Sequence, residues 1–375
     1  MFAYWCSDRY ANMKYCHPRR VGMIRSHWQI EALHHASAQA GRAVRTGRCT
    51  QSGPEDLHAL RIGTAPGDGR LCGEDEEAHM RVGMTVLPEY SGETARKIWA
   101  SVEEYGFDHG WTFDHLGWDG LLDGPWYGTV PTLTLAALVT SRLEIGTLVA
   151  SPNFRHPVAF SRDLIGLDEI SEGRLTLGVG AGAEGGYDVD VFGAGAPKSR
   201  VRRFGEFVEL LDRLLREDHV SFQGDYYSAV DARSVPGCRQ RPRLPFIVAA
   251  NGPGAASVAA RYGQGWVTIG GMAERLDAWW GLVSEASDRM TAALATHGRE
   301  ADPEFRRVLQ TDAAPVLSIQ SADCFDDFLG RADELGFTDV VAPWPRAQGP
   351  FSAPRSVVDR IAADVLPRWR TSQND

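Results

Sequence analysis

One stretch of the chain, residues 143–182, constrains the fold more than any other. It contains two short apolar runs, Ile145–Ala150 and Leu175–Val179, and a helix-like segment from about Pro157 to Ser171 lies between them. The first run ends in SPN and the second in the glycine-rich GVGAG, and neither continues a strand. This order predicts a βαβ unit and therefore a parallel sheet. Ligands bind at the C-terminal ends of the strands in such sheets, so both loops are candidate binding segments.

From Met80 onward, strand-like and helix-like runs alternate along the chain. The strand-like runs are 82–86, 110–113, 145–150, 175–179, 245–250, 266–269, 308–311 and 337–342. A helix-like run follows each of them, and residues 220–228 alternate like a hairpin inserted between two units. Eight such units predict an α/β fold of the (β/α)8 TIM-barrel type. A doubly wound open sheet is the alternative, although eight strands exceed its usual six.

Residues 1–79 differ from the rest of the chain. They hold four of the six cysteines and six of the eleven histidines, and their apolar residues follow no sustained period. We expect 1–79 to be an N-terminal extension that is disordered or not part of the natural protein, with 80–375 as the barrel domain. A small separate domain is the alternative. The pairs Cys16-His17 and His34-His35 can suggest a metal site, but no metal-ligand spacing accompanies them, and we predict none.

Charge and hydropathy exclude several classes of partner. The chain has 39 basic and 49 acidic residues, a net charge of -10, which argues against nucleic acid or an anionic membrane as partner. Arg142 and Glu144 interrupt the most apolar region, so a membrane span is not expected. The N-terminal residues lack the pattern of a secretory signal, and we expect a cytoplasmic protein with free thiols that acts on a small molecule.

A histidine after the second strand is the first candidate for chemistry. His115 lies in the run WTFDHLGW, and an imidazole there can exchange a proton near neutral pH. Asp114 precedes it and Trp118 follows, so both are candidate site residues. Neighbouring residues of an extended strand point to opposite faces, and Asp114 therefore need not touch His115. An ordinary histidine in a surface loop is the alternative interpretation.

Three further loops carry weaker signals. Asn153 and Arg155 follow the third strand, and the glycine loop from Gly178 to Gly186 follows the fourth. The glycine loop can bring backbone N–H groups to a phosphate, but it matches neither a P-loop nor a dinucleotide fingerprint. Asn251-Gly252 follows the fifth strand, and Arg202 and Arg203 can supply positive charge. Each could be a plain loop or a solvated helix face; together they predict a rim that binds a phosphate-bearing ligand.

The motifs of the body resemble those of the bacterial luciferase-like flavin-dependent oxidoreductases, a (β/α)8 family. The resemblance covers about Arg81 to Val365, and it rests on TFDHL, EIGTLVASPNFRHPVAF, LDEISEGRLTLGVGAG and AANGPGAASVAARYGQGW in family order. It implies a reduced flavin (FMN) or the deazaflavin coenzyme F420 across the barrel mouth, a small organic substrate and a homodimer. The FDHL motif favours F420.

The resemblance also assigns roles to residues. It implies a non-prolyl cis peptide bond at Leu148–Val149, in a bulge that supports the ring of the coenzyme. His115 matches the active-site histidine of the deazaflavin branch, and Trp111 and Trp118 would wall the pocket. The residues expected near the coenzyme are Leu148, Val149, Asn153, Gly180, Ala181, Gly182, Asn251 and Gly252.

Two departures bear on the substrate. The glucose-6-phosphate dehydrogenases of the family follow their glycine loop directly with a glutamate, whereas here Ala183 intervenes before Glu184. The tryptophan that those enzymes have near the histidine is displaced by one position in this chain, to Trp118. Both departures argue against glucose 6-phosphate.

We predict an oxidoreductase in which His115 handles the proton while hydride is transferred or oxygen is activated. A non-catalytic flavin-binding protein is the alternative, and a hydrolase lacks any supporting motif. Residues 119–129 and 187–200 are expected to contact the substrate, and they hold no recognisable chemistry.

Overall fold

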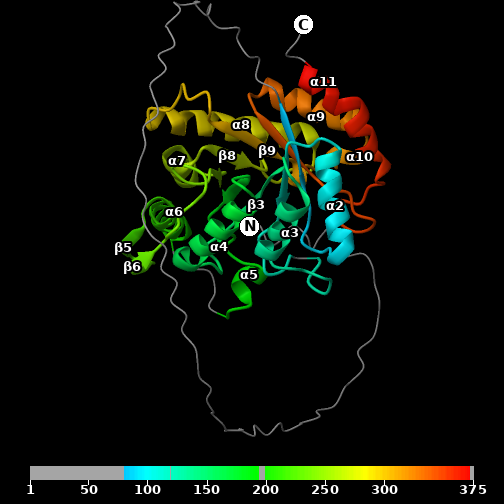
Figure 1. The fold of residues 1–375 in the computed structure, drawn as a ribbon. Coiled ribbons are helices and arrows are strands. Elements are labelled where there is room, and N and C mark those ends of the chain that lie inside the picture. Colours follow the sequence, from blue (N-terminus) through cyan, green and yellow to red (C-terminus); the bar gives the residue numbers. More distant parts are fainter. Residues whose placement is uncertain (1–79, 119, 194–198, 372–375) are drawn as a thin grey trace, which may run out of the picture. The chain divides into compact units, whose positions relative to one another are not determined.

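The computed structural model describes residues 80–118, 120–193 and 199–371, so the predictions for 1–79 lie outside the described residues. Eight parallel strands close a barrel in the order β1-β10-β9-β8-β7-β4-β3-β2 (Figure 1). The closed order confirms the predicted TIM barrel and excludes the open sheet. The strands are β1 (Arg81–Thr85), β2 (His109–Thr112), β3 (Glu144–Ala150), β4 (Leu175–Val179), β7 (Phe246–Ala249), β8 (Gly265–Thr268), β9 (Arg306–Gln310) and β10 (Asp339–Pro343).

Helices surround the barrel, and short elements lie in its loops (Figure 1). The predicted hairpin is present as β5 (His219–Gln223) and β6 (Ser228–Arg233), and it extends beyond the expected residue 228. The four-residue helix α5, between β4 and α6, was not predicted. The helical elements are α2 (Gly92–Glu104), α3 (Thr129–Val139), α4 (Pro157–Ile170), α5 (Tyr187–Asp190), α6 (Arg200–Arg216), α7 (Pro253–Tyr262), α8 (Leu276–Thr296), η1 (Thr311–Ala313), η2 (Ser318–Gln320), α9 (Ala322–Glu334), α10 (Ser356–Arg360), η3 (Ile361–Val365) and α11 (Leu366–Thr371).

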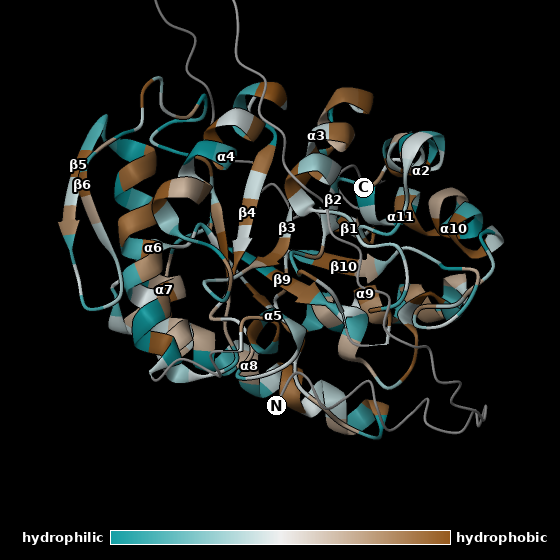
Figure 2. Ribbon diagram, turned by 90° about the horizontal axis from the view of Figure 1, so that it is seen from below, coloured by the Kyte–Doolittle hydropathy of each residue, from teal (hydrophilic) through white to brown (hydrophobic). Residues whose placement is uncertain are grey.

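Alternating strand residues fill the barrel from inside. In Figure 2 the hydrophobic residues gather among the central strands. We call the apolar residues that meet in the barrel the interior cluster: Trp111, Leu148, Ile247, Val267, Val308 and Val341. A Cβ at Gly146 would lie 2.5 Å from Cζ3 of Trp111, so only glycine on β3 leaves room for the indole. The small residue beside the large one lets this cluster close-pack.

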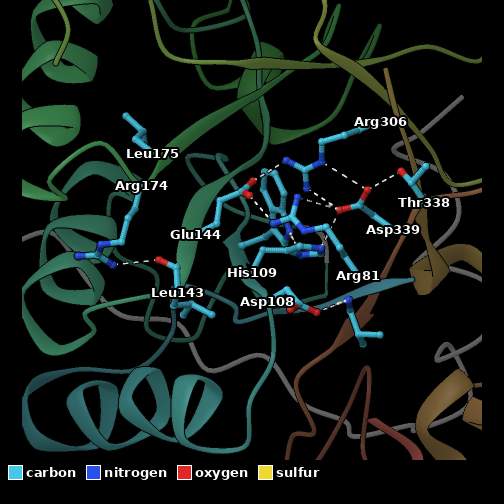
Figure 3. A network of polar contacts seen from close by, with 12 residues as sticks. Arg81, Asp108, His109, Leu143, Glu144, Arg174, Leu175, Arg306, Thr338 and Asp339 are labelled. Atoms are coloured by element: carbon cyan, nitrogen blue, oxygen red, sulfur yellow. Dashed lines mark hydrogen bonds and ion pairs between the residues drawn. The ribbon is translucent and has the colours of Figure 1, made fainter. Parts of the chain in front are cut away.

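A network of charged residues closes the N-terminal end of the barrel (Figure 3). Arg306 lies 2.8 Å from Glu144 and 2.5 Å from Asp339, and Arg81 lies 2.6 Å from Glu144. Burial alone would raise the pKa of Glu144, but Arg306, Arg81 and His109 outweigh it and hold the pKa at about 2. We expect this paired network to support the fold rather than the chemistry, because TIM-barrel active sites lie at the other end of the barrel.

His109 connects this network to the interior cluster. Its Nε2 lies 3.1 Å from Asp339 Oδ1, and its Nδ1 accepts a hydrogen bond of 2.7 Å from the indole N–H of Trp111. The indole is therefore held in one orientation inside the barrel. Among the described helices, none is long and apolar enough to cross a lipid bilayer.

Candidate active site

His115 lies just beyond β2, at the C-terminal mouth of the barrel, and it is paired with Asp188 of α5. Its Nδ1 is 2.6 Å from Asp188 Oδ2, and the other carboxylate oxygen accepts a hydrogen bond of 2.7 Å from the backbone N–H of Leu116. An ionised carboxylate only accepts, so Nδ1 is the donor and Nε2 is left as the proton acceptor. The His115 side chain is 34% exposed, whereas that of Asp188 is 9% exposed. The pair thus presents a fixed imidazole with a free nitrogen.

Asp114 has a different partner. Its two oxygens accept hydrogen bonds of 2.5 and 2.6 Å from Nε and Nη2 of Arg155. The carboxylate is buried, and the guanidinium also stacks on Phe160, 4.2 Å from the ring centre. Asp114 therefore ties the end of β2 to the loop after β3, and its carboxylate is engaged by Arg155 rather than by His115.

The acid that meets His115 lies in a segment expected to hold no recognisable chemistry, and that expectation was wrong for Asp188. Within 187–200 the sequence gives no motif for it: Asp188 is one of two acids in the short run YDVD. The pairing of Asp188 with His115 is seen only in the folded structure, where the segment after β4 lies against the end of β2.

The third strand ends in the predicted bulge. The peptide bond between Leu148 and Val149 is cis, and the pairing of β3 with β4 changes register between Thr147 and Ala150. Leu148 belongs to the interior cluster, and Val149 packs beside it. A Cβ at Gly180 would lie 2.8 Å from Cγ2 of Val149. A residue without a side chain is thus required at Gly180, directly after β4 and next to the bulge.

Two arginines of α6 hold the glycine loop. Arg203 donates a hydrogen bond of 2.6 Å to the side-chain oxygen of Asn153, whose amide donates to the carbonyl of Ala183 at 3.1 Å. Arg200 donates to the carbonyl of Gly182. The Nε atoms of Arg200 and Arg203 are buried and have no partner among the described residues. Two buried N–H donors with positive charge fit a phosphate-bearing ligand.

One of the arginines chosen from the sequence does not join this group. Arg202 pairs with Asp225 at 2.7 Å, and both side chains are about 70% exposed. The predicted role of Arg202 in supplying charge to the rim therefore passes to Arg200. Solvated ion pairs of this kind contribute little to the stability of the fold.

The remaining candidates lie around the same mouth. Asn251 accepts a hydrogen bond of 2.7 Å from the Thr268 hydroxyl, and Gly252 caps the N-terminus of α7. Trp118 stacks on Phe351 with ring centres 5.7 Å apart and meets Phe113 edge-on. These residues lie at the C-terminal end of the barrel. Trp111 does not: it is fully buried in the interior cluster and donates to His109, so the expectation that it walls the pocket was wrong. Among the described residues, no group of three or more His, Cys, Asp or Glu side chains could hold a metal ion.

The comparison with protein families decides the class. The sequence profile of the luciferase-like monooxygenases matches residues 80–323. The chain belongs to this family. The match confirms the resemblance predicted from the motifs, and with it the predicted kind of protein, an oxidoreductase that works with a flavin or deazaflavin coenzyme.

Relatives at about 30% identity support this placement. An F420-dependent glucose-6-phosphate dehydrogenase of Amycolatopsis mediterranei is 31% identical over 274 residues, 67% of this chain and 80% of that protein. The protein of the same name from Beutenbergia cavernae is 30% identical over 326 residues, 72% and 91% of the two chains. An F420-dependent hydroxymycolic acid dehydrogenase of Mycobacterium tuberculosis is 32% identical over 171 residues, 44% and 46%.

Solved structures share the fold. The coenzyme F420-dependent tetrahydromethanopterin reductase from Methanopyrus kandleri superposes with a TM-score of 0.63 at 18% identity, covering 78% of this chain and 100% of that one. An F420-dependent secondary alcohol dehydrogenase gives a TM-score of 0.64 at 18% identity, covering 78% and 99%. At this identity the likeness concerns the fold alone.

Proposed function

We propose that this chain is an F420-dependent oxidoreductase that transfers a hydride between the coenzyme and an alcohol or carbonyl substrate. The observation that carries the proposal is the His115–Asp188 pair, which lies at the barrel mouth with one imidazole nitrogen free. The relatives named for F420 support the choice of coenzyme.

The residues of the mouth fit such a coenzyme. The bulge at Leu148–Val149 offers an apolar support for a flat ring, and Gly180 leaves the neighbouring backbone uncovered. Arg200 and Arg203 contact Gly182 and Asn153, and each has a buried, unpartnered Nε–H that a phosphate of the coenzyme tail would accept. The bound deazaflavin would supply a ring that accepts or returns a hydride.

His115 then handles the proton of the substrate hydroxyl. Asp188 holds Nδ1–H, so Nε2 can take the hydroxyl proton as the C–H bond breaks, or return it in the reverse direction. The carboxylate also stabilises the imidazolium that forms. A general base of this kind contributes about 10²–10⁴-fold. Phe113, Trp118 and Phe351 pack together beside His115, and they would keep water from the reacting groups.

We propose a substrate other than glucose 6-phosphate. Glu184, displaced by one position from the family's glutamate, is 69% exposed and lies 3.6 Å from Arg200 in an ion pair. A carboxylate placed in this way is not held at the mouth as an acid for the reaction. The homodimer implied by the resemblance stays a prediction.

An anaerobic assay tests the proposal. The purified full chain is mixed with F420 and a panel of primary and secondary alcohols, and the loss of coenzyme absorbance is followed. We expect at least one alcohol to reduce F420, with turnover that His115→Ala lowers by about 10²–10⁴-fold. In a parallel assay in air, oxygen consumption with reduced FMN, without any F420 reduction in the anaerobic assay, would instead indicate a monooxygenase. Tight coenzyme binding without redox turnover would indicate the non-catalytic binding protein.

A further inference from the structure

Asp312 brings a further carboxyl group to the barrel mouth. It follows β9, which β1 and β10 separate from β2. Val308 of β9 belongs to the interior cluster, and Gln310 lies two residues further along, on the same inward face. Gln310 also pairs in register with Val341 of that cluster. The amide of Gln310 donates a hydrogen bond of 2.6 Å to Asp312 Oδ2, so the carboxyl group lies at the mouth end of the interior cluster.

The other oxygen of this carboxyl group has no partner. Asp312 Oδ1 is buried and receives no hydrogen bond from any described residue. The neighbouring hydroxyl of Thr311 is already engaged, at 2.8 Å from the Ser318 hydroxyl and 3.2 Å from the carbonyl of Val341. Buried polar atoms in native proteins are nearly always hydrogen-bonded. The unpaired Asp312 Oδ1 therefore indicates a hydrogen-bond partner from outside the described chain.

The protonation state of Asp312 suits an uncharged partner that has hydrogen-bond donors or acceptors. Burial raises the pKa of Asp312 to about 7, and the hydrogen bond from Gln310 offsets only part of this rise. The carboxyl group is therefore present in both forms near neutral pH, and it can accept or donate a hydrogen bond.

The bulge lies at the same end of the barrel. Leu148 belongs to the interior cluster that Gln310 borders. Flavin-type rings have a polar edge of carbonyl and N–H groups. We propose that Asp312 Oδ1 hydrogen-bonds this polar edge of the coenzyme ring, and that Gln310 positions the carboxyl group for it. The inference rests on the proposed function, because it takes the ring on the bulge to be that of F420.

A purely structural role for Asp312 predicts a different outcome. A buried carboxyl oxygen without a partner destabilises the protein when no ligand is bound, so its replacement should not lower the melting temperature. If the carboxyl group instead held η1 in place, its replacement would lower the melting temperature. Stability without coenzyme and affinity for coenzyme therefore separate the two roles, and neither measurement depends on turnover.

The test compares Asp312→Leu and Asp312→Asn with the wild type, and with the exposed Asp277→Asn as a control. Each full-length protein is first unfolded thermally without coenzyme, then titrated with F420 and followed by coenzyme fluorescence. We expect melting temperatures at or above that of the wild type. The Kd for F420 should rise about tenfold for Asp312→Leu, the loss of one hydrogen bond. Asp312→Asn keeps a donor and an acceptor and should lose about threefold or less.

The outcomes separate this inference from the function beneath it. Unchanged affinity in Asp312→Leu, or a lowered melting temperature with unchanged affinity, overturns the role of Asp312 and leaves the proposed function intact. A wild type that binds no F420 contradicts the proposed function itself. If Asp312→Leu fails to fold, the expected gain in stability is already contradicted, and Asp312→Asn still reports on the hydrogen bond.

Discussion

Asp188 Oδ2 lies 2.6 Å from His115 Nδ1, although 73 residues separate them in the chain. The second oxygen of Asp188 is held by the backbone N–H of Leu116, next to the histidine. The carboxylate therefore fixes both the orientation of the ring and the position of its proton. This contact links the loop after β2 to α5 in the segment after β4, and it orients the imidazole that we propose as the proton-transfer group.

Removing this carboxylate should slow turnover without preventing coenzyme binding. We expect His115→Ala to lower kcat by about 10²–10⁴-fold. Asp188→Asn should lower it by about 10- to 100-fold, because the amide can hold the ring but does not stabilise an imidazolium. His156→Ala, at the N-cap of α4, is the matched control and should keep kcat. Steady-state kinetics together with the Kd for coenzyme check this. An Asp188→Asn variant with full kcat would remove Asp188 from the mechanism.

Asp114 should matter for stability more than for chemistry. Asp114→Asn leaves the largely buried guanidinium of Arg155 without its carboxylate, and we expect a loss of about 3 kcal/mol in the free energy of unfolding. Asp277→Asn removes the partner of Arg275 in an exposed pair and should change it by less than about 1 kcal/mol. Urea unfolding measures both. Equal losses of stability in the two variants would contradict the role of Asp114 as the stabilising partner of Arg155.

Glycine at position 180 should be required for the shape of the bulge. Gly180→Ala places a methyl group 2.8 Å from Cγ2 of Val149 and 3.2 Å from Cβ of Ala249. We expect a loss of about 1–3 kcal/mol in stability and weaker coenzyme binding, because the bulge must move. Gly166→Ala is the control: a Cβ there meets nothing within 4 Å, and α4 should gain up to about 1 kcal/mol. Coenzyme affinity unchanged by Gly180→Ala would show that the bulge does not contact the ring.

The charged network at the N-terminal end should make the protein sensitive to acid. The pKa of Glu144 is lowered in the folded state to about 2, so its pairing stabilises the fold fully above about pH 4.5. This stability is lost as the pH falls from there towards 2. Urea unfolding at pH 7, 4 and 3 should therefore show a steeper decline for the wild type than for Glu144→Gln. Glu217→Gln, from an exposed pair with Arg213, should follow the wild type. Parallel curves for wild type and Glu144→Gln would contradict this account.

The barrel could be predicted because its signals are local. Apolar runs of four to six residues, each ended by glycine, proline or a polar turn, specify strands wherever helices separate them. The bulge was predicted as well, since the run EIGTLVASPNF carries the resemblance, and the cis bond at Leu148–Val149 confirms it. The fourth strand has the predicted ends, whereas most other strand ends differ by one or two residues, in part because turn residues such as Gly265 and Pro343 take part in pairing.

The partners of the site residues could not be predicted. Asp188 meets His115 only because the loop after β4 folds back over the mouth, and no spacing in the sequence encodes that path. Asp114 next to His115 was the obvious acid, yet adjacent residues of an extended segment face opposite sides, and its carboxylate meets Arg155 instead. Asp312 carries no motif either; only the unpaired oxygen in the folded chain draws attention to it.

Coenzyme titration tests the central claim most directly. The purified full chain is titrated in parallel with F420 and with FMN, and fluorescence reports the affinity and the number of sites. We expect F420 to saturate one site per chain and to bind more tightly than FMN, with the affinity reduced when Arg200 and Arg203 are both replaced by glutamine. Binding of FMN alone, or of neither coenzyme, would contradict the assignment of this chain as an F420-dependent oxidoreductase.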